Sequence, residues 1–258
     1  MRYRNIGFAT TGSYSGTYTV PELDFRKRTA GWPTNTIAVS DTSLVLYLDA
    51  NNYSSGTTWS DQSGTGNDMI FNSAPSTGTD STGKYISIDG THYAATANAI
   101  IGTADRSLFT YIAVVQPTTL NIPSYNTVMG TMATSYTQMG FYVDSGNNKN
   151  YMMGRNAGAG ILITNLGVNT VVLNAWVMIG ITGDGSTSFT MYVNGALLST
   201  QVCITTAQTN GRTTIGSYNN AGSEPFRGNI AWAKVYNRTL SATEMTNEYN
   251  NVKSRFGI

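Results

Sequence analysis

The chain has 258 residues and a formal net charge of +1, and only 11% of its residues are charged. A net charge this small implies no bulk electrostatic partner, and the body of the chain has no basic stripe that would favour nucleic acid. A single cysteine, Cys203, excludes an intrachain disulfide and therefore a disulfide-stapled secreted domain. No stretch approaches the roughly eighteen apolar residues that a membrane-spanning helix requires.

Residues 1–43 predict an extended arm that anchors the chain. Glycine and proline interrupt every candidate element there and leave one short strand at 18–20. Five basic and two acidic residues fall within the first 28 positions, and no apolar segment of the signal-peptide kind is present. A disordered tail is the alternative, because termini usually lack order. The side chains expected to dock on a partner are Tyr3, Phe8, Tyr14, Tyr18, Phe25, Arg26, Lys27, Arg28 and Trp32.

From residue 44 onward, short apolar runs alternate with turns, which predicts one domain over 44–258. The predicted strands are 44–49, 69–71, 85–88, 108–116, 126–132, 140–144, 151–153, 161–164, 176–182, 188–193, 197–202, 213–216 and 229–236. Because no long helices separate them, a parallel sheet is excluded and the strands are expected to be antiparallel. Asn194-Gly195 predicts a tight primed hairpin turn, and the glycine-rich stretch 154–160 predicts a loop.

One short helix is predicted near the C-terminus. Ser241 is a suitable N-cap, and Glu244 three residues later completes a capping box. Gly257 is suited to end the helix. One face is apolar at helical spacing, which predicts packing on the sheets, and it comprises Met245, Tyr249, Val252 and Phe256.

Several segments together resemble the laminin-G-like, concanavalin A-like jelly-roll superfamily. They are LVLYLDA, WSDQSGTGND, YISIDGTHY, FTMYVNGALL and the closing run FRGNIAWAKVYNRTLSATEMTNEYNNVKSRFG. In the closing run, the pattern Tyr-Asn-Arg-x-Leu-Ser-x-x-Glu before a terminal helix is similar to the ending of virus and bacterial members. The resemblance covers about residues 44–257 and implies an all-β, antiparallel β-sandwich of two sheets with six or seven strands each. Function stays open, because this fold carries lectins, adhesins, glucanases and virion modules.

The acidic residues do not fit a glycosidase, so no enzyme activity and no catalytic residue are expected. Glucanases that the chain resembles place two carboxylates alternately along one strand, and such enzymes need the pair to flank the bond. Of the four glutamates, Glu22, Glu224, Glu244 and Glu248, only Glu22 has an aspartate two residues later, and both of those residues lie in the predicted arm. One histidine, His92, and one cysteine cannot build a zinc site alone.

Asp49, Asp61 and Asp68 lie among asparagines in one polar stretch. If these loops converge, their oxygens are weak candidates for calcium, which takes six to eight oxygen ligands. The simpler interpretation is that they anchor turns through side chain-to-backbone hydrogen bonds. We expect turn chemistry and no cofactor, with calcium as the open alternative.

Sugar binding stays open as a second function class. A lectin site needs an aromatic ring to stack on the sugar and amides or carboxylates to hold its hydroxyls. Candidates from predicted loops are Tyr53, Tyr125, Asn126, Tyr218, Asn219 and Asn220.

These observations predict a virion structural protein of a phage-like virus, located at the particle surface. The jelly roll would project outward as a capsid decoration or fibre-head module, and the arm would dock on a major capsid or tail protein. The alternative is a lectin-like adhesin that binds host or environmental glycans. No nucleic acid or membrane partner is expected, and a homo-oligomer stays open.

Overall fold

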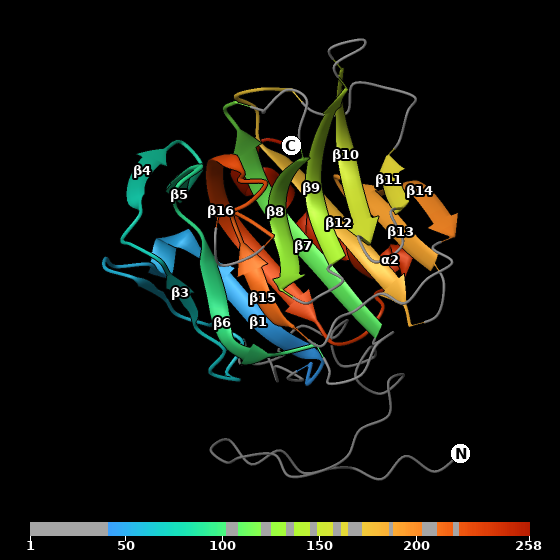
Figure 1. Ribbon diagram of the computed structural model, residues 1–258, viewed down its shortest axis with the longest axis horizontal. Coiled ribbons are helices and arrows are strands. Elements are labelled where there is room, and N and C mark those ends of the chain that lie inside the picture. Colours follow the sequence, from blue (N-terminus) through green and yellow to red (C-terminus); the bar gives the residue numbers. More distant parts are fainter. Residues whose placement is uncertain are drawn as a thin grey trace, which may run out of the picture. The chain divides into compact units, whose positions relative to one another are not determined.

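The protein forms a two-layered antiparallel β-sandwich with one C-terminal helix (Figure 1). The computed structural model describes residues 41–101, 108–119, 125–132, 137–144, 149–156, 161–164, 172–185, 188–202, 211–218 and 222–258. The arm residues predicted at positions 3 to 32 lie outside these ranges. The jelly-roll fold class expected from the sequence is confirmed.

The first sheet, sheet A, has eight strands. Its path is β14-β13-β12-β7-β16-β5-β4, and β1 pairs additionally with β16. The bounds are β1 Leu44–Asp49, β4 Ser76–Asp80, β5 Gly83–Asp89, β7 Leu108–Pro117, β12 Val177–Asp184, β13 Ser188–Val193, β14 Ala196–Val202 and β16 Arg227–Tyr236.

The second sheet, sheet B, also has eight strands, in the order β11-β10-β9-β8-β15-β6-β3-β2. Its bounds are β2 Thr58–Trp59, β3 Met69–Phe71, β6 Ala94–Ala99, β8 Tyr125–Met132, β9 Thr137–Asp144, β10 Lys149–Asn156, β11 Ile161–Thr164 and β15 Arg212–Ile215. A one-turn 3-10 helix, η1, follows β1 at Ala50–Asn52.

Two sequence expectations about the sheets were wrong. Each sheet has eight strands rather than six or seven, because the sequence pattern gave no sign of β2, β4 and β6. The predicted loop at 154–160 is wrong in its first part, because β10 continues to Asn156 and pairs with both β9 and β11. The remainder of that stretch lies outside the described residues.

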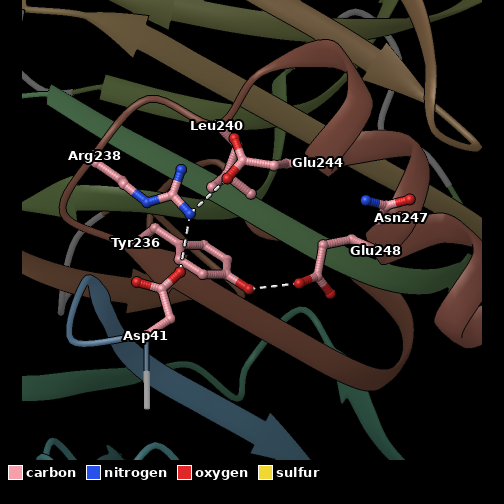
Figure 2. A pocket seen from close by; sticks show the side chains of 7 residues that line it. All are labelled: Asp41, Tyr236, Arg238, Leu240, Glu244, Asn247 and Glu248. Atoms are coloured by element: carbon pink, nitrogen blue, oxygen red, sulfur yellow. Dashed lines mark hydrogen bonds and ion pairs between the residues drawn. The ribbon is translucent and has the colours of Figure 1, made fainter. Parts of the chain in front are cut away.

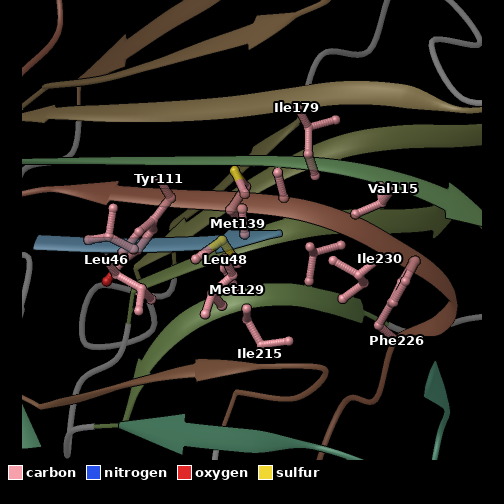
Figure 3. Close-up of a cluster of buried hydrophobic side chains, with 14 of the residues drawn as sticks. Leu46, Leu48, Tyr111, Val115, Met129, Met139, Ile179, Ile215, Phe226 and Ile230 are labelled. Carbon is pink, nitrogen blue, oxygen red and sulfur yellow. The ribbon is translucent and has the colours of Figure 1, made fainter. Parts of the chain in front are cut away.

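The core fills the space between the two sheets (Figure 3). Alternate residues along a strand point to opposite faces, so every second side chain of sheet A enters this layer. Leu46, Val115 and Ile230 come from sheet A and meet Met129 and Met139 of sheet B, and all five are fully buried. Burying side chains of this size stabilises the fold by roughly 1.5–3 kcal/mol each.

Strand β16 organises sheet A. It pairs with β7 along one side, and its other side is shared by β5 and β1. Asn229 of β16 lies opposite Ser87 of β5 and Gln116 of β7. Sheet A is therefore centred on a strand that comes late in the sequence.

Helix α2, Ala242–Phe256, packs on the outer face of sheet A. Its predicted capping box and left-handed Gly257 cap are both confirmed. Met245, Val252 and Phe256 are buried, whereas Tyr249 is half-buried. No helix in the described part of the chain is long and apolar enough to cross a membrane.

The Asn194-Gly195 turn is also confirmed, and it supports the helix. Both residues have positive φ, as a primed two-residue turn requires. The Thr246 hydroxyl donates to the Gly195 carbonyl at 3.2 Å. A Cβ at Gly195 would lie 2.6 Å from Cβ of Tyr249, so only glycine lets α2 approach this turn.

Candidate functional site

Asp61 anchors the polar turn that precedes β3. Its carboxylate accepts five hydrogen bonds, from the backbone N–H groups of Tyr47, Ser63 and Asn67 and from the hydroxyls of Ser63 and Thr65. Burial alone would raise the pKa of Asp61, but these hydrogen bonds bring the pKa below its ordinary value. The hydrogen bonds agree with the turn-anchoring interpretation of this stretch.

The other two predicted carboxylates have separate structural roles. Asp68 Oδ1 accepts the N–H of Asp61 at 2.8 Å. Asp49 accepts the N–H of Asn51 at 2.9 Å and forms an ion pair with Arg255 of α2. The three carboxylates therefore do not converge on one point. Among the described residues, no group of three or more His, Cys, Asp and Glu side chains is placed to hold a metal ion.

Tyr53 and Asn126 are not available for sugar binding, so these two candidates were wrong. Tyr53 is only 3% exposed and packs edge-to-face on Phe71, with ring centroids 6.3 Å apart. Asn126 is fully buried within β8, and Tyr125 begins that strand instead of lying in a loop. Tyr53 therefore belongs to the core, and Asn126 belongs to the strand that was itself predicted at 126–132.

Tyr218 lies in a bend after β15 and is half-buried. Its N–H donates to the Ser223 carbonyl at 3.3 Å, and the Phe226 N–H donates to the Gly216 carbonyl at 3.0 Å. These two bonds bring the ends of this connection together. Gly222 of this segment faces Tyr93 from the connection between β5 and β6, since a Cβ at Gly222 would lie 3.3 Å from the Tyr93 ring. The segments that contain Tyr93 and Tyr218 thus lie side by side at one rim of the sandwich. Asn219 and Asn220 lie outside the described residues.

The same two segments also contain acidic and imidazole groups. Asp89 Oδ1 lies 2.8 Å from His92 Nδ1 and accepts hydrogen bonds from Thr91. Burial would raise the pKa of Asp89, but the bonds from Thr91 and His92 hold this pKa well below its ordinary value. Glu224 has a φ of +51°, and its carboxylate accepts a hydrogen bond from the Gln138 amide at 2.8 Å. Left-handed backbone at a non-glycine residue costs about 1–3 kcal/mol and tends to occur at functional sites.

We call this cluster the tyrosine rim, and its members are Asp89, His92, Tyr93, Tyr218 and Glu224. The sequence identified Tyr218 but missed Tyr93, Asp89 and Glu224 as its neighbours. The pairing of β6 with β15 brings the two loops together, because it starts from Ala94 opposite Ile215. No local sequence pattern indicates that β6 and β15 are paired.

The closing motif of the sequence surrounds a second polar feature, a cavity of about 160 Å³ between the end of β16 and α2 (Figure 2). Arg238 Nη2 lies 2.9 Å from Asp41 Oδ2 and 2.8 Å from Glu244 Oε1. The Tyr236 hydroxyl donates to Glu248 at 2.6 Å. Each charged group in this motif therefore has a partner within the domain.

This arrangement explains the motif Tyr-Asn-Arg-x-Leu-Ser-x-x-Glu as a structural clamp. Arg238 joins the start of the described chain to the first turn of α2, and its Nε also donates to the Ser43 hydroxyl at 2.7 Å. Contact with Arg238 lowers the pKa of Glu244 to about 2. Asp41 and Ser43 thus belong to the contacts of the domain, although the predicted domain boundary was at residue 44.

The chain is similar to known proteins in both sequence and structure. A family model described as the concanavalin A-like lectin/glucanases superfamily (Laminin_G_3) matches residues 88–246. No protein of curated function matches the sequence.

Domain 4 of AbnA, a GH43 extracellular arabinanase from Geobacillus stearothermophilus solved in complex with arabinotriose, has a TM-score of 0.59 and 12% identity. The match covers 80% of this chain and 97% of that domain.

Two further structures share the fold over smaller parts of their length. The binding domain of Paraclostridial Mosquitocidal Protein 1 has a TM-score of 0.59 and 16% identity, over 81% of this chain and 52% of that one. Trypanosoma rangeli sialidase in complex with 2,3-difluoro-KDN has a TM-score of 0.58 and 18% identity, over 82% of this chain and 33% of the enzyme. At these identities the similarity concerns the fold alone.

Proposed function

The chain belongs to the concanavalin A-like lectin/glucanases superfamily, and on that premise we propose that its jelly roll is a glycan-binding module. The observation that carries this proposal is the tyrosine rim, where two adjacent segments contain two half-buried tyrosines, two carboxylates and an imidazole. Tyrosine presents an apolar face and a polar tip, so it suits ligands that have both C–H faces and hydroxyls. The arabinotriose complex of the arabinanase domain supports the same ligand class.

Binding without hydrolysis fits the acidic residues better than catalysis does. A glycosidase needs two carboxylates that flank the scissile bond, one of which protonates the leaving oxygen. Glu244 is paired with Arg238, and Glu248 is paired with Lys234 and Tyr236. Glu244 and Glu248 are therefore engaged in structural contacts and are not placed to protonate a leaving oxygen.

The test is glycan-array binding followed by calorimetry with any hit. Tyr218→Ala and Tyr93→Ala should each weaken binding by about tenfold or more, since every tenfold corresponds to about 1.4 kcal/mol. Tyr249→Ala is the matched control, because it removes a half-buried tyrosine from α2, outside the rim. No binding across a broad array by folded protein would refute the proposal.

We also propose that this module belongs to the surface of a virus particle and that its arm anchors it there. The support is the composition of residues 1–43, which are basic, aromatic and interrupted by glycine and proline. Such a segment gains little from folding alone, since ordering its backbone costs about 1–2 kcal/mol per residue. A capsid or tail protein would supply apolar pockets, or a sheet edge for residues 18–20.

The test of the anchor is deletion of residues 1–40. The truncated protein should fold yet be missing from purified virions, and its copy number there is the measurement. Normal incorporation of the truncated protein would show that the jelly roll itself is the anchor.

A further inference from the structure

A row of uncharged polar side chains crosses the outer face of sheet A, outside the tyrosine rim. Ser87 of β5, Asn229 of β16 and Gln116 of β7 lie side by side in register. The next residues along two of these strands, Ile230 and Val115, are in the core. Strand alternation therefore directs the polar row outward. Figure 1 shows β5, β16, β7 and β12 as neighbours in this sheet.

The row is held in one conformation by its own hydrogen bonds. Asn229 Nδ2 donates to Gln116 Oε1 at 2.7 Å, and Gln116 Nε2 donates to the Asn174 carbonyl at 3.0 Å. Asn229 is only 8% exposed. Within the described part of the chain, neither Asn229 Oδ1 nor the Ser87 hydroxyl makes a hydrogen bond. Asn229 Oδ1 is not among the fully buried unpartnered atoms of the described residues, so it is open to accept from a ligand hydroxyl or from water.

Two half-buried aromatic rings stand beside this row. The ring centroids of Tyr85 and Trp176 are 6.1 Å apart, and Trp176 also packs on Phe256 of α2 at 5.3 Å. The Trp176 indole N–H donates to Asp80 Oδ2 at 3.1 Å. Tyr85 packs closely on Gly78, where a Cβ would come within 2.3 Å of the ring. Both rings are thus fixed before any ligand arrives, which lowers the entropy cost of binding.

We propose that Ser87, Gln116, Asn229, Tyr85 and Trp176 form a second saccharide subsite, selective for neutral sugars. A sugar ring would place its C–H face on the aromatic pair, with its hydroxyls toward Asn229 Oδ1 and Ser87 Oγ. The polar row carries no charge, and Asp80, which accepts from the Trp176 indole N–H, would repel an anionic sugar. The subsite rests on the proposed function only for the class of ligand, since it shares no residue with the tyrosine rim.

The experiment is a titration of the full-length ¹⁵N-labelled protein, read at the Trp176 indole N–H resonance. Trp176→Phe identifies this resonance by removing it. The probes are cellotriose, maltotriose and arabinotriose as neutral sugars, and sialyllactose as the anionic comparison. At least one neutral trisaccharide should shift the resonance saturably, and sialyllactose should bind at least about tenfold more weakly.

Variants of the polar row locate the binding. Asn229→Ala and Ser87→Ala should each weaken the neutral sugar by about tenfold, whereas Asn247→Ala, an exposed amide on α2, should leave it unchanged. Ser87→Ala is the safeguard in case Asn229→Ala does not fold. Tyr218→Ala should not alter the Trp176 titration, so a failure at the rim and a failure here are distinguishable.

Four outcomes would overturn the subsite. The Trp176 resonance could fail to shift with every neutral probe, or shift equally with sialyllactose. The neutral sugar could also shift the resonance with the same affinity in the folded Asn229→Ala and Ser87→Ala variants as in the unmodified protein. A shift that is lost in Tyr218→Ala would show that the outer face reports binding at the rim and is no site of its own.

Discussion

Arg255 Nη1 lies 2.7 Å from Asp49 Oδ2, and this contact joins the C-terminal helix to the end of the first strand. A second bond, from Nη2 to Oδ1 at 3.1 Å, makes the pair bidentate. The Asp49 side chain is only 12% exposed. Loss of either partner would therefore leave a charge that is mostly shielded from water.

We predict that Arg255→Leu lowers the free energy of unfolding by about 1–3 kcal/mol, as expected when a charged hydrogen-bonding partner is removed. Urea denaturation with a fitted midpoint and slope measures the change. Ser254→Ala, an exposed position one residue earlier in α2, should change it little. Equal midpoints for the two variants would mean that the ion pair contributes nothing to stability.

Two substitutions near the start of α2 should destabilise the protein to different degrees. Ser241→Ala should cost about 1 kcal/mol, because the N-cap hydroxyl accepts the Glu244 N–H. Met245→Ala should cost more, about 2–5 kcal/mol, because its side chain is fully buried against sheet A. Thermal melts would rank both against Thr243→Ala, an exposed neighbour. A reversed order would contradict the packing of α2.

Acid should unfold the protein partly through Asp61. The pKa of Asp61 is below its ordinary 3.8 in the folded state, so its hydrogen bonds stabilise the fold fully above that value. This stability is lost as the pH falls below 3.8 and through the folded-state pKa. Asp61→Asn should therefore lower stability at pH 7 and flatten its decline between about pH 4 and 2. Urea midpoints across this range are the measurement, and Asp24→Asn in the arm is the control.

Calcium removal should leave the domain unchanged. A calcium ion present at one hundred times its Kd would add about 2.7 kcal/mol. Its removal would lower the melting temperature by roughly 5–10 °C in a domain of this size. Because Asp61 already accepts five hydrogen bonds, we expect EDTA to shift the melting temperature by less than about 1 °C. A large drop that Asp61→Ala abolishes would reveal a calcium site.

The Arg238 clamp predicts a sharp difference between two truncations. Removing residues 1–40 keeps Asp41 and Ser43, so the melting temperature should stay near that of the full chain. Removing residues 1–43 deletes Asp41 and Ser43, leaves Arg238 with Glu244 alone of these three partners, and should lower the melting temperature below that of the first truncation. Thermal melts of the two proteins in parallel test this, and identical values would show that the clamp has no energetic role.

Features that depend on neighbouring residues in sequence were predictable. The capping box, the left-handed Gly257 and the Asn194-Gly195 turn were all correct, because each is set by backbone preferences over a few residues. Strands β4 and β6 were missed because no local preference in their sequences marks them as strands. Their sequences, STGTD and AATANA, lack the β-branched and aromatic residues that mark a strand, and pairing with their neighbours determines them.

The site residues were harder to predict because they depend on pairing between distant strands. The polar sequence around Tyr53 is typical of an exposed loop, yet Phe71 and Lys84 cover the Tyr53 ring. Trp176 and Tyr85 are about ninety residues apart in sequence, and only the order of strands in sheet A brings their rings together. Spacing along the chain contains no information about that order.

The position of β16 also determines when the protein can fold. Strands β1, β5 and β7 all pair with it, yet it is the last strand to be synthesised. A chain that is still on the ribosome therefore exposes three unpaired strand edges until residue 236 has emerged. Contacts this distant in sequence slow folding and expose the intermediate to aggregation. Expression yield should consequently depend more on temperature and chaperone supply during synthesis than on the stability of the finished domain.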